Sequence, residues 1–335
     1  NNCYGYLIGN PPDEKGKGEG MAQMFQMMNE ERLGTAVLAL GTASAAYQQS
    51  LAYSKERVQS AKLTDMRGPA VRIIEHEDIR RMLMFQKSII EACRAMIMKT
   101  YYYIDLMHDS PDPAEREFAE AMFHMSNPLC KAYTSDMAWQ TICEAIQVYG
   151  GYGFIEEYPC AQYARDVKIF SIWEGTNYIQ ALDLCARKMT MKKGKVVMTF
   201  MQEIGKTLAI HKNVAGFEDE IKILGEAFTD YQGILGLFNG FMTSGKINML
   251  GVFATRILHA TAMVYAGSLI LDQAVLATKK LAEVGEDHFD ASYYKGKIAS
   301  ARFFIKNIVP QVFNIKRVME IGDSTCADIP EECIR

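Results

Sequence analysis

From Met21 onward, apolar residues recur almost without interruption at the three- and four-residue spacing of an α-helix. No stretch after residue 20 has the alternating pattern of a half-buried strand. Long helices joined by short connections bury their apolar faces against one another, so the sequence predicts an all-α protein built from helical bundles. The clearest faces are Leu33, Val37, Leu40, Ser44, Tyr47 and Leu51, then Met82, Phe85, Ile89, Ala92, Met96 and Tyr103.

Caps and breakers divide this pattern into elements. Asp112-Pro113 is a typical helix start, and we expect Pro128 to interrupt or kink the helix that follows. Gly150-Gly151 predicts the end of a further helical run, and Thr176 is a plausible N-cap for a helix over 177–188. Later helices are expected around Phe200–Leu208, Phe217–Tyr231 and Ile247–Leu281, and one over Tyr293–Met319.

We therefore expect a four-helix bundle over residues 21–190 and a second helical domain over 195–320, with the boundary near 190–195. In terms of domains, residues 1–20 form a leading segment, 21–190 the bundle and 191–335 the additional helical domain. The leading segment begins with a strand-like run, Tyr4–Gly9, followed by a loop over 10–20. A lone strand has no pairing partner, and the chain does not start with Met, so we expect further residues upstream.

Composition narrows the class of protein. The net charge is −4 and no stretch is strongly basic, which gives no support to nucleic acid as a partner. The eight cysteines form no C-x-x-C pair and the six histidines show no H-x-x-x-H spacing, so free thiols and no metal site are expected. We find no apolar run of membrane-spanning length and no signal peptide, so we expect no membrane span and a cytoplasmic location.

One group of residues carries chemistry. Gln147-x-x-Gly150-Gly151-x-Gly153 is followed by Arg165-Asp166 and then by Glu174-Gly175-Thr176. Glu174 lies in a loop with apolar and aromatic neighbours, where a partly dehydrated carboxylate could serve as a general base. Taken locally, the same residues are also compatible with a glycine pair that ends a helix and a surface glutamate.

The spacing of the three pieces resembles a known signature. The run QVYGGYGFIEEYPCAQYARDVKIFSIWEGTNYIQ is similar to that of the acyl-CoA dehydrogenase family. EERLGTAVLALGTASAAYQQSLAYSKERVQ and IIEHEDIRRMLMFQKSIIEACRAM resemble two of its helices, so the resemblance covers about residues 4–190. The tail, with YYKGKIASARFFIKNIVP, resembles the extra helical domain of a long-form subgroup.

The resemblance implies a flavoenzyme that converts an acyl-CoA thioester to a trans-2-enoyl-CoA, with FAD as cofactor. In the family, a carboxylate at the position of Glu174 removes the proton from Cα, and hydride passes from Cβ to N5 of FAD. Arg32 matches the family's active-site arginine near the base and the CoA. The implied partners are an electron-transfer flavoprotein as electron acceptor and a second copy of the chain, as a homodimer or dimer of dimers.

The cofactor contacts implied by the resemblance lie in three places. Arg57 matches the arginine that contacts the FAD pyrophosphate, typically across a dimer interface, and Gln59 would assist it. Gln147, Gly150 and Gly151 match contacts to the same dinucleotide, and Thr176 matches a flavin contact within its own subunit. The family places its flavin between a small β-domain and the bundle, so these 335 residues alone are expected to hold FAD poorly.

Two departures leave alternatives open. Tyr178 stands where many relatives have Gln, so no flavin contact is assigned there. Glu31 precedes Arg32, at a position where some branches of the family carry the catalytic Glu, although it could be an ordinary charge in the first turn of a helix. Two other functions are also open: an acyl-CoA oxidase, which shares the fold, and a non-catalytic helical assembly fragment.

Overall fold

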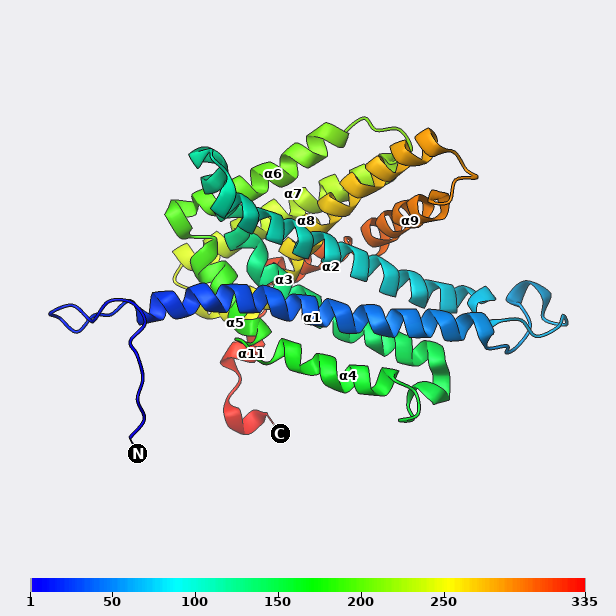
Figure 1. Ribbon diagram of the computed structural model, residues 1–335, viewed down its shortest axis with the longest axis horizontal. Coiled ribbons are helices and arrows are strands. Elements are labelled where there is room, and N and C mark those ends of the chain that lie inside the picture. The colour runs from blue at the N-terminus through cyan, green and yellow to red at the C-terminus, as the bar shows by residue number, and fades with distance from the viewer. Residues whose placement is uncertain (1, 335) are drawn as a thin grey trace.

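The computed structural model describes residues 2–334, and helices dominate this range (Figure 1). Among these residues no strand is formed, and the one extended pairing is an isolated antiparallel bridge between Val58 and Arg72. The all-α prediction is therefore confirmed.

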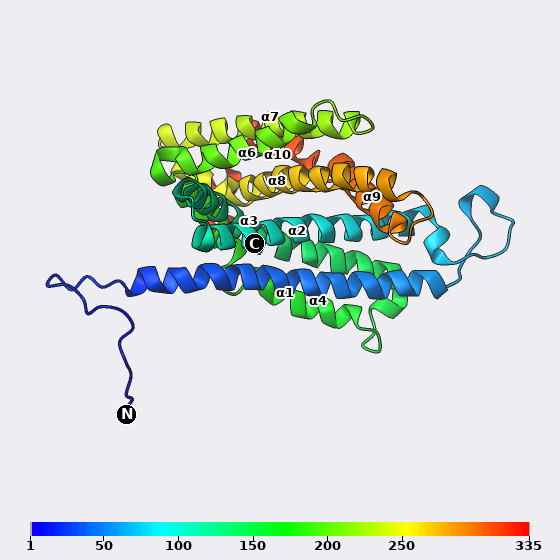
Figure 2. The same cartoon turned by 45° about the horizontal axis from the view of Figure 1, so that its top comes forward.

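Three long helices that pack against one another build the first half. α1 spans Gly20–Glu56, α2 spans Glu77–Asp109 and α3 spans Pro113–Tyr149. α4 (Cys160–Lys168) and α5 (Asn177–Leu182) follow, and α4 lies along the side of α1 that faces away from the C-terminal helices (Figure 2). The Asp112 side chain accepts a hydrogen bond from the Ala114 N–H at 2.9 Å, so the predicted cap of α3 is confirmed.

The second half stacks further layers of helices on α2 and α3 (Figure 2). Left-handed residues Lys192, Lys193 and Gly194 turn the chain between the two halves, close to the expected boundary. The helices of this half are α6 (Lys195–His211), α7 (Glu218–Thr243), α8 (Ile247–Val284), α9 (Ala291–Asn307), α10 (Gln311–Ile321) and α11 (Thr325–Asp328).

The predicted apolar face of α1 is confirmed in part. Leu33 and Leu40 are buried, but Val37 is 42% exposed. The buried stripe also runs through small residues, with Ala36, Ala39 and Ala43 at 0–2% exposed, and alanines allow α1 to pack closely against α3. The face predicted for α2 is confirmed, with Met82, Ile89, Ala92, Met96 and Tyr103 all buried.

Two prolines have different effects on the helices around them. Pro128 lies inside α3, which continues through it from Pro113 to Tyr149, so this helix is not interrupted. The helix expected over 293–319 is instead split into α9 and α10, with Pro310 immediately before α10. A proline has no N–H to donate to the preceding turn, and its fixed φ suits the start of a new helix.

Residues 4–9, where a strand is expected, form no strand in this structure. The segment is irregular, and Tyr4, Tyr6 and Ile8 are 83–101% exposed. No neighbouring segment offers its backbone for pairing, so the extended run has no hydrogen-bonded partner.

A single hydrophobic core joins the two halves, running from Leu33 in α1 to Met319 in α10. α8 lies at its centre and packs against α2, α3, α5, α6, α7, α9 and α10. By length and composition α8 could cross a membrane, so the expectation that no apolar run reaches membrane-spanning length is wrong. However, 78% of its most apolar window is buried within the protein, as in a core helix.

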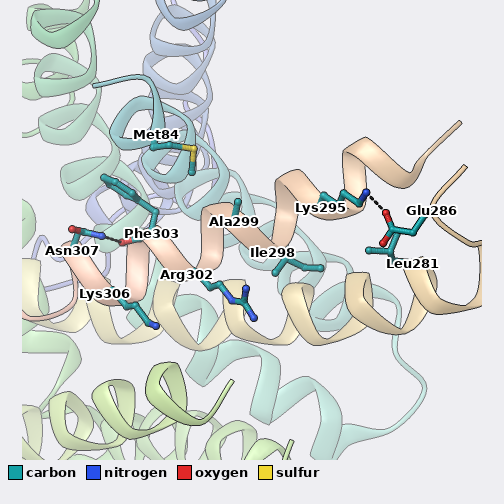
Figure 3. Close-up of a pocket in the computed structure, with 10 residues that line it drawn as sticks. All are labelled: Met84, Leu281, Glu286, Lys295, Ile298, Ala299, Arg302, Phe303, Lys306 and Asn307. Carbon is teal, nitrogen blue, oxygen red and sulfur yellow. Dashed lines mark hydrogen bonds and ion pairs between the residues drawn. The ribbon is translucent and has the colours of Figure 1, made fainter. Parts of the chain in front are cut away.

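An open hollow of about 670 Å³ lies between α9, the end of α8 and Met84 of α2 (Figure 3). Lys295 and Glu286 form an ion pair at one end, and the Asn307 amide donates to the Phe303 carbonyl at the other. None of the candidate site residues lines this hollow.

Candidate functional site

Glu174 lies in the loop between α4 and α5, in an unusual backbone conformation. Its φ is +55° and that of Gly175 is +79°, so two successive residues adopt left-handed geometry. For a non-glycine residue this geometry is disfavoured, and such strain is concentrated at functional sites. The Thr176 hydroxyl accepts from the Ile179 N–H at 3.3 Å, and the Gln180 amide donates to the Gly175 carbonyl at 3.1 Å. The predicted N-cap is thus confirmed, and these bonds fix the loop to α5.

Arg32 lies beside this loop, although it is far away in sequence. It is only 5% exposed, and its Nη1 lies 3.5 Å from Oδ2 of Asp183. Its Nη2 lies close to Gly175: a Cβ added to this glycine would be 3.6 Å from that nitrogen. Burial lowers the pKa of the Arg32 guanidinium, whereas Asp183 and Glu174 raise it. Its Nε is buried and has no hydrogen-bond partner among the described residues.

Lys131 is a functional candidate that sequence reasoning missed. It is fully buried in α3, and its Nζ donates to Oδ1 of Asn177, the first residue of α5, at 2.9 Å. Burial lowers the pKa of Lys131 to about 8, opposed by the nearby carboxylates of Asp136 and Glu174. Arg32 and Lys131 therefore both lie within electrostatic reach of Glu174. No local signal marks a buried lysine within a long helix.

Glu31, the alternative base, has different surroundings. It is exposed on α1, and its charge acts on the Tyr101 hydroxyl of α2, whose pKa is raised mainly by burial. The carboxylates that act on Arg32 are Asp183 and Glu174. The loop geometry thus favours Glu174 over Glu31 as the carboxylate of a site around Arg32.

The other predicted residues meet at the opposite end of α1. Arg57, Gln59, Gln147, Gly150 and Gly151 line one open pocket of about 580 Å³. Three different segments supply them: the end of α1 and its following loop, the end of α3, and the turn after α3. Gly150 ends α3 with φ +61° and ψ −138°, a conformation that favours glycine.

The residues of this pocket suit a diphosphate. Arg57 is exposed and forms no ion pair within residues 2–334, and its guanidinium lies 5.7 Å from the centre of the Tyr152 ring. A planar guanidinium without a carboxylate partner can make two bonds to one phosphate group. Tyr149 stacks on Tyr53 at 4.3 Å and both line the pocket, so aromatic walls that sequence reasoning missed accompany the cation.

The two groups of residues are far apart within one chain. About 25 residues of α1 separate Arg32 from Arg57, which at about 1.5 Å per residue is roughly 38 Å. Within one chain, the residues near Arg32 and those that line the Arg57 pocket are therefore separated by most of the length of α1.

The bundle and its glycine-rich turn match a known family. Residues 18–189 match the family model "Acyl-CoA dehydrogenase, C-terminal domain", and residues 200–330 match "Acetyl-CoA dehydrogenase C-terminal like". The chain belongs to the acyl-CoA dehydrogenase family, whose cofactor is FAD.

Individual relatives agree with this assignment. The chain is 56% identical over 331 residues to a butyryl-CoA dehydrogenase of Syntrophomonas wolfei, covering 99% of this chain and 54% of that protein. It is 32% identical to the broad-specificity linear acyl-CoA dehydrogenase FadE5 of Mycobacterium tuberculosis, covering 93% of this chain and 52% of that protein. The chain thus spans about half the length of these curated relatives.

A solved structure shares the fold. The structure of Caenorhabditis elegans ACDH-11 in complex with C11-CoA superposes with a TM-score of 0.72 at 19% identity. The match covers 93% of this chain and 49% of that one. The resemblance therefore extends through the C-terminal helices, beyond the first bundle.

Proposed function

We propose that the protein containing this chain catalyses the α,β-dehydrogenation of an acyl-CoA thioester to a trans-2-enoyl-CoA. The supporting observation is the position of Glu174, in a strained loop beside the buried guanidinium of Arg32, in a chain of this family. Relatives 56% and 52% identical to the chain are named butyryl-CoA dehydrogenases. We therefore propose a short, saturated, linear acyl chain as substrate.

Glu174 would remove the proton from Cα of the thioester. Thr176 and Gln180 hold the backbone of the loop that carries Glu174, which limits the reorganisation needed for proton transfer. Arg32 would bind the polar part of the CoA thioester close to this carboxylate. FAD, when bound, supplies the acceptor for the hydride that leaves Cβ.

Arg57, Gln59, Gln147, Gly150 and Gly151 would hold the FAD diphosphate, and Thr176 would contact the flavin. Because these two groups are roughly 38 Å apart along α1, each cofactor would draw Arg57 from one protomer and Thr176 from another. We therefore propose a homodimer, or a dimer of dimers, as the active form. An electron-transfer flavoprotein is the proposed acceptor for the electrons.

Anaerobic mixing of butyryl-CoA with the whole FAD-loaded protein that contains this chain tests the proposal; every FAD-loaded variant described below is likewise made in that whole protein. We expect loss of the flavin absorbance and a product two hydrogens lighter, detected by mass spectrometry. Retention of the flavin absorbance with saturated acyl-CoA thioesters of every chain length would contradict it. Exposing the reduced protein to air then separates the alternatives, because rapid reoxidation by oxygen identifies an acyl-CoA oxidase and slow reoxidation a dehydrogenase.

A further inference from the structure

The N-terminus of α5 is anchored by one amide side chain. Asn177 is the first residue of α5, three positions after Glu174, and is 8% exposed. Its Oδ1 accepts from Lys131, and its Nδ2 lies 2.7 Å from Oδ1 of Asp136 and 2.9 Å from Oγ of Ser135. Both ends of the amide are therefore used, and the start of α5 has a fixed position relative to α3.

Asp136 extends this anchor toward the C-terminal half. Its two carboxylate oxygens have different partners, because Oδ1 faces Asn177 while Oδ2 lies 3.0 Å from Nε2 of His259 in α8. The Tyr133 ring packs edge-on against the imidazole at 5.4 Å. His259 thereby holds the Asp136 carboxylate in the orientation that meets Asn177.

α8 touches α5 at a second point. The Tyr178 hydroxyl lies close to Gly251: a Cβ added to this glycine would be 3.0 Å from the hydroxyl oxygen. Tyr178 directly follows Asn177, and Gly251 precedes His259 by about two turns of α8. The long central helix of the C-terminal half therefore supports the helix that carries the Glu174 loop.

We propose that His259 is a positioning residue that acts through Asp136 and Asn177 to hold the Glu174 carboxylate for proton abstraction. The inference rests on the proposed function of Glu174. It gives the C-terminal half an indirect part in the chemistry, because α8 supplies the imidazole that is hydrogen-bonded to Asp136. A displacement of about 1 Å at a reacting group can cost about a hundredfold in rate.

The test compares three substitutions of His259 in the FAD-loaded protein. Gln and Glu are equal in size and differ in charge, and Leu is the third. In His259→Gln, an amide N–H can still donate to Asp136, whereas His259→Glu places a second carboxylate opposite it. His259→Leu removes the hydrogen bond without adding charge. Each variant is mixed anaerobically with saturating butyryl-CoA, and the rate of flavin bleaching, the dissociation constant for butyryl-CoA and the α-deuterium isotope effect are measured.

We expect His259→Glu and His259→Leu to bleach about ten- to a hundredfold more slowly, with a larger isotope effect, because proton abstraction is slowed. FAD content and butyryl-CoA affinity should stay within about twofold of wild type, and His259→Gln should recover to within about fivefold of the wild-type rate. His211→Leu is the matched control. It removes a similar imidazole–carboxylate pair, to Asp272 at 2.9 Å, away from α5, and should leave the bleaching rate unchanged.

The outcomes separate this proposal from the proposed function. If wild type does not bleach with acyl-CoA, the proposed function fails and the positioning role fails with it. If wild type bleaches and all His259 variants match it, only the positioning role is wrong. Equal losses in the Gln and Glu variants, or losses explained by weaker FAD or butyryl-CoA binding, would also overturn it. Should His259→Leu not fold, the Gln and Glu pair decides.

Discussion

His124 shows what burial does to a single titratable residue. Its ring is mostly enclosed, and its Nδ1 lies 3.1 Å from Nζ of Lys188. Burial, followed by the nearby Lys188 charge, lowers the pKa of His124 to about 4, although Glu120 opposes both effects. The imidazole is therefore neutral in the folded protein at pH 7 and accepts a hydrogen bond from the Lys188 ammonium.

The lowered pKa of His124 predicts a loss of folding stability in acid. The folded pKa is below the unfolded value of 6.5, so the unfolded chain binds more protons as the pH falls from about 6.5 to about 4. The corresponding stabilisation is complete above pH 6.5 and is lost across this window. Its size is on the order of 3 kcal/mol, at about 1.36 kcal/mol per pKa unit.

His124→Gln keeps an acceptor for Lys188 but cannot titrate. In urea unfolding at pH 6.5 and pH 4, the free energy of unfolding should fall by less in this variant than in wild type. Parallel pH dependences for the two proteins would show that His124 makes no such contribution.

Residues of the candidate site could be found from sequence only where they belong to a motif. Glu174, Thr176 and Arg57 stand at characteristic spacings, so the resemblance identifies them. Lys131 and His259 carry no local signal, because a lysine or histidine in a helical pattern is recognised as buried or paired only once the helices are packed. The left-handed backbone of Glu174 is likewise set by the folded loop.

At the scale of elements, helix ends were more predictable than helix faces. Asp112 and Gly150 define the ends of α3, because a capping carboxylate and a left-handed glycine act locally. The buried face of α1 depends on how closely α3 approaches, and the alanines that allow this approach are weak hydrophobic signals. Pro310 ends a helix whereas Pro128 does not, a difference that arises from packing in the core.

Two exposed glycines, one inside α1 and one at the end of α3, give a matched test of the C-cap of α3. Both Gly41 in α1 and Gly150 have open space where a Cβ would be, but only Gly150 has positive φ. Gly41→Ala should raise the free energy of unfolding by about 0.5–1 kcal/mol, because glycine is costly within a helix. Gly150→Ala should lower it by about 1–3 kcal/mol, because φ +61° with ψ −138° is a backbone conformation that residues with a Cβ rarely adopt. Denaturant unfolding measures both, and shifts of the same sign would contradict the assigned C-cap.

At the scale of the whole molecule, sequence predicts the fold class but not how the two halves join. The amphipathic pattern indicates helices throughout, and the turn at 192–194 lies where a boundary was expected. The pattern does not indicate that α8 serves both halves as one shared core, since its residues are apolar on nearly every side. The distance between Arg32 and Arg57 also becomes evident only when α1 is seen as one long helix (Figure 1).

The separation of Arg32 from Arg57 within one chain predicts complementation between protomers. Each of Glu174→Gln and Arg57→Glu should abolish turnover when present in every protomer. A purified heterodimer of the two should recover about half of the wild-type activity, because one of its two sites combines an intact Glu174 with an intact Arg57 from the other protomer. An inactive heterodimer that still contains both chains would place both residues at a site within one protomer.

The identity of the base is the central claim, and single-turnover flavin reduction tests it most directly. Glu174→Gln, Glu31→Gln and wild type are loaded with FAD and mixed anaerobically with butyryl-CoA. We predict that Glu174→Gln still binds FAD and butyryl-CoA but bleaches about 10²–10⁴-fold more slowly, the usual cost of removing a general base. Glu31→Gln should bleach at close to the wild-type rate. A Glu174→Gln protein that bleaches like wild type, beside an inactive Glu31→Gln protein, would contradict the account.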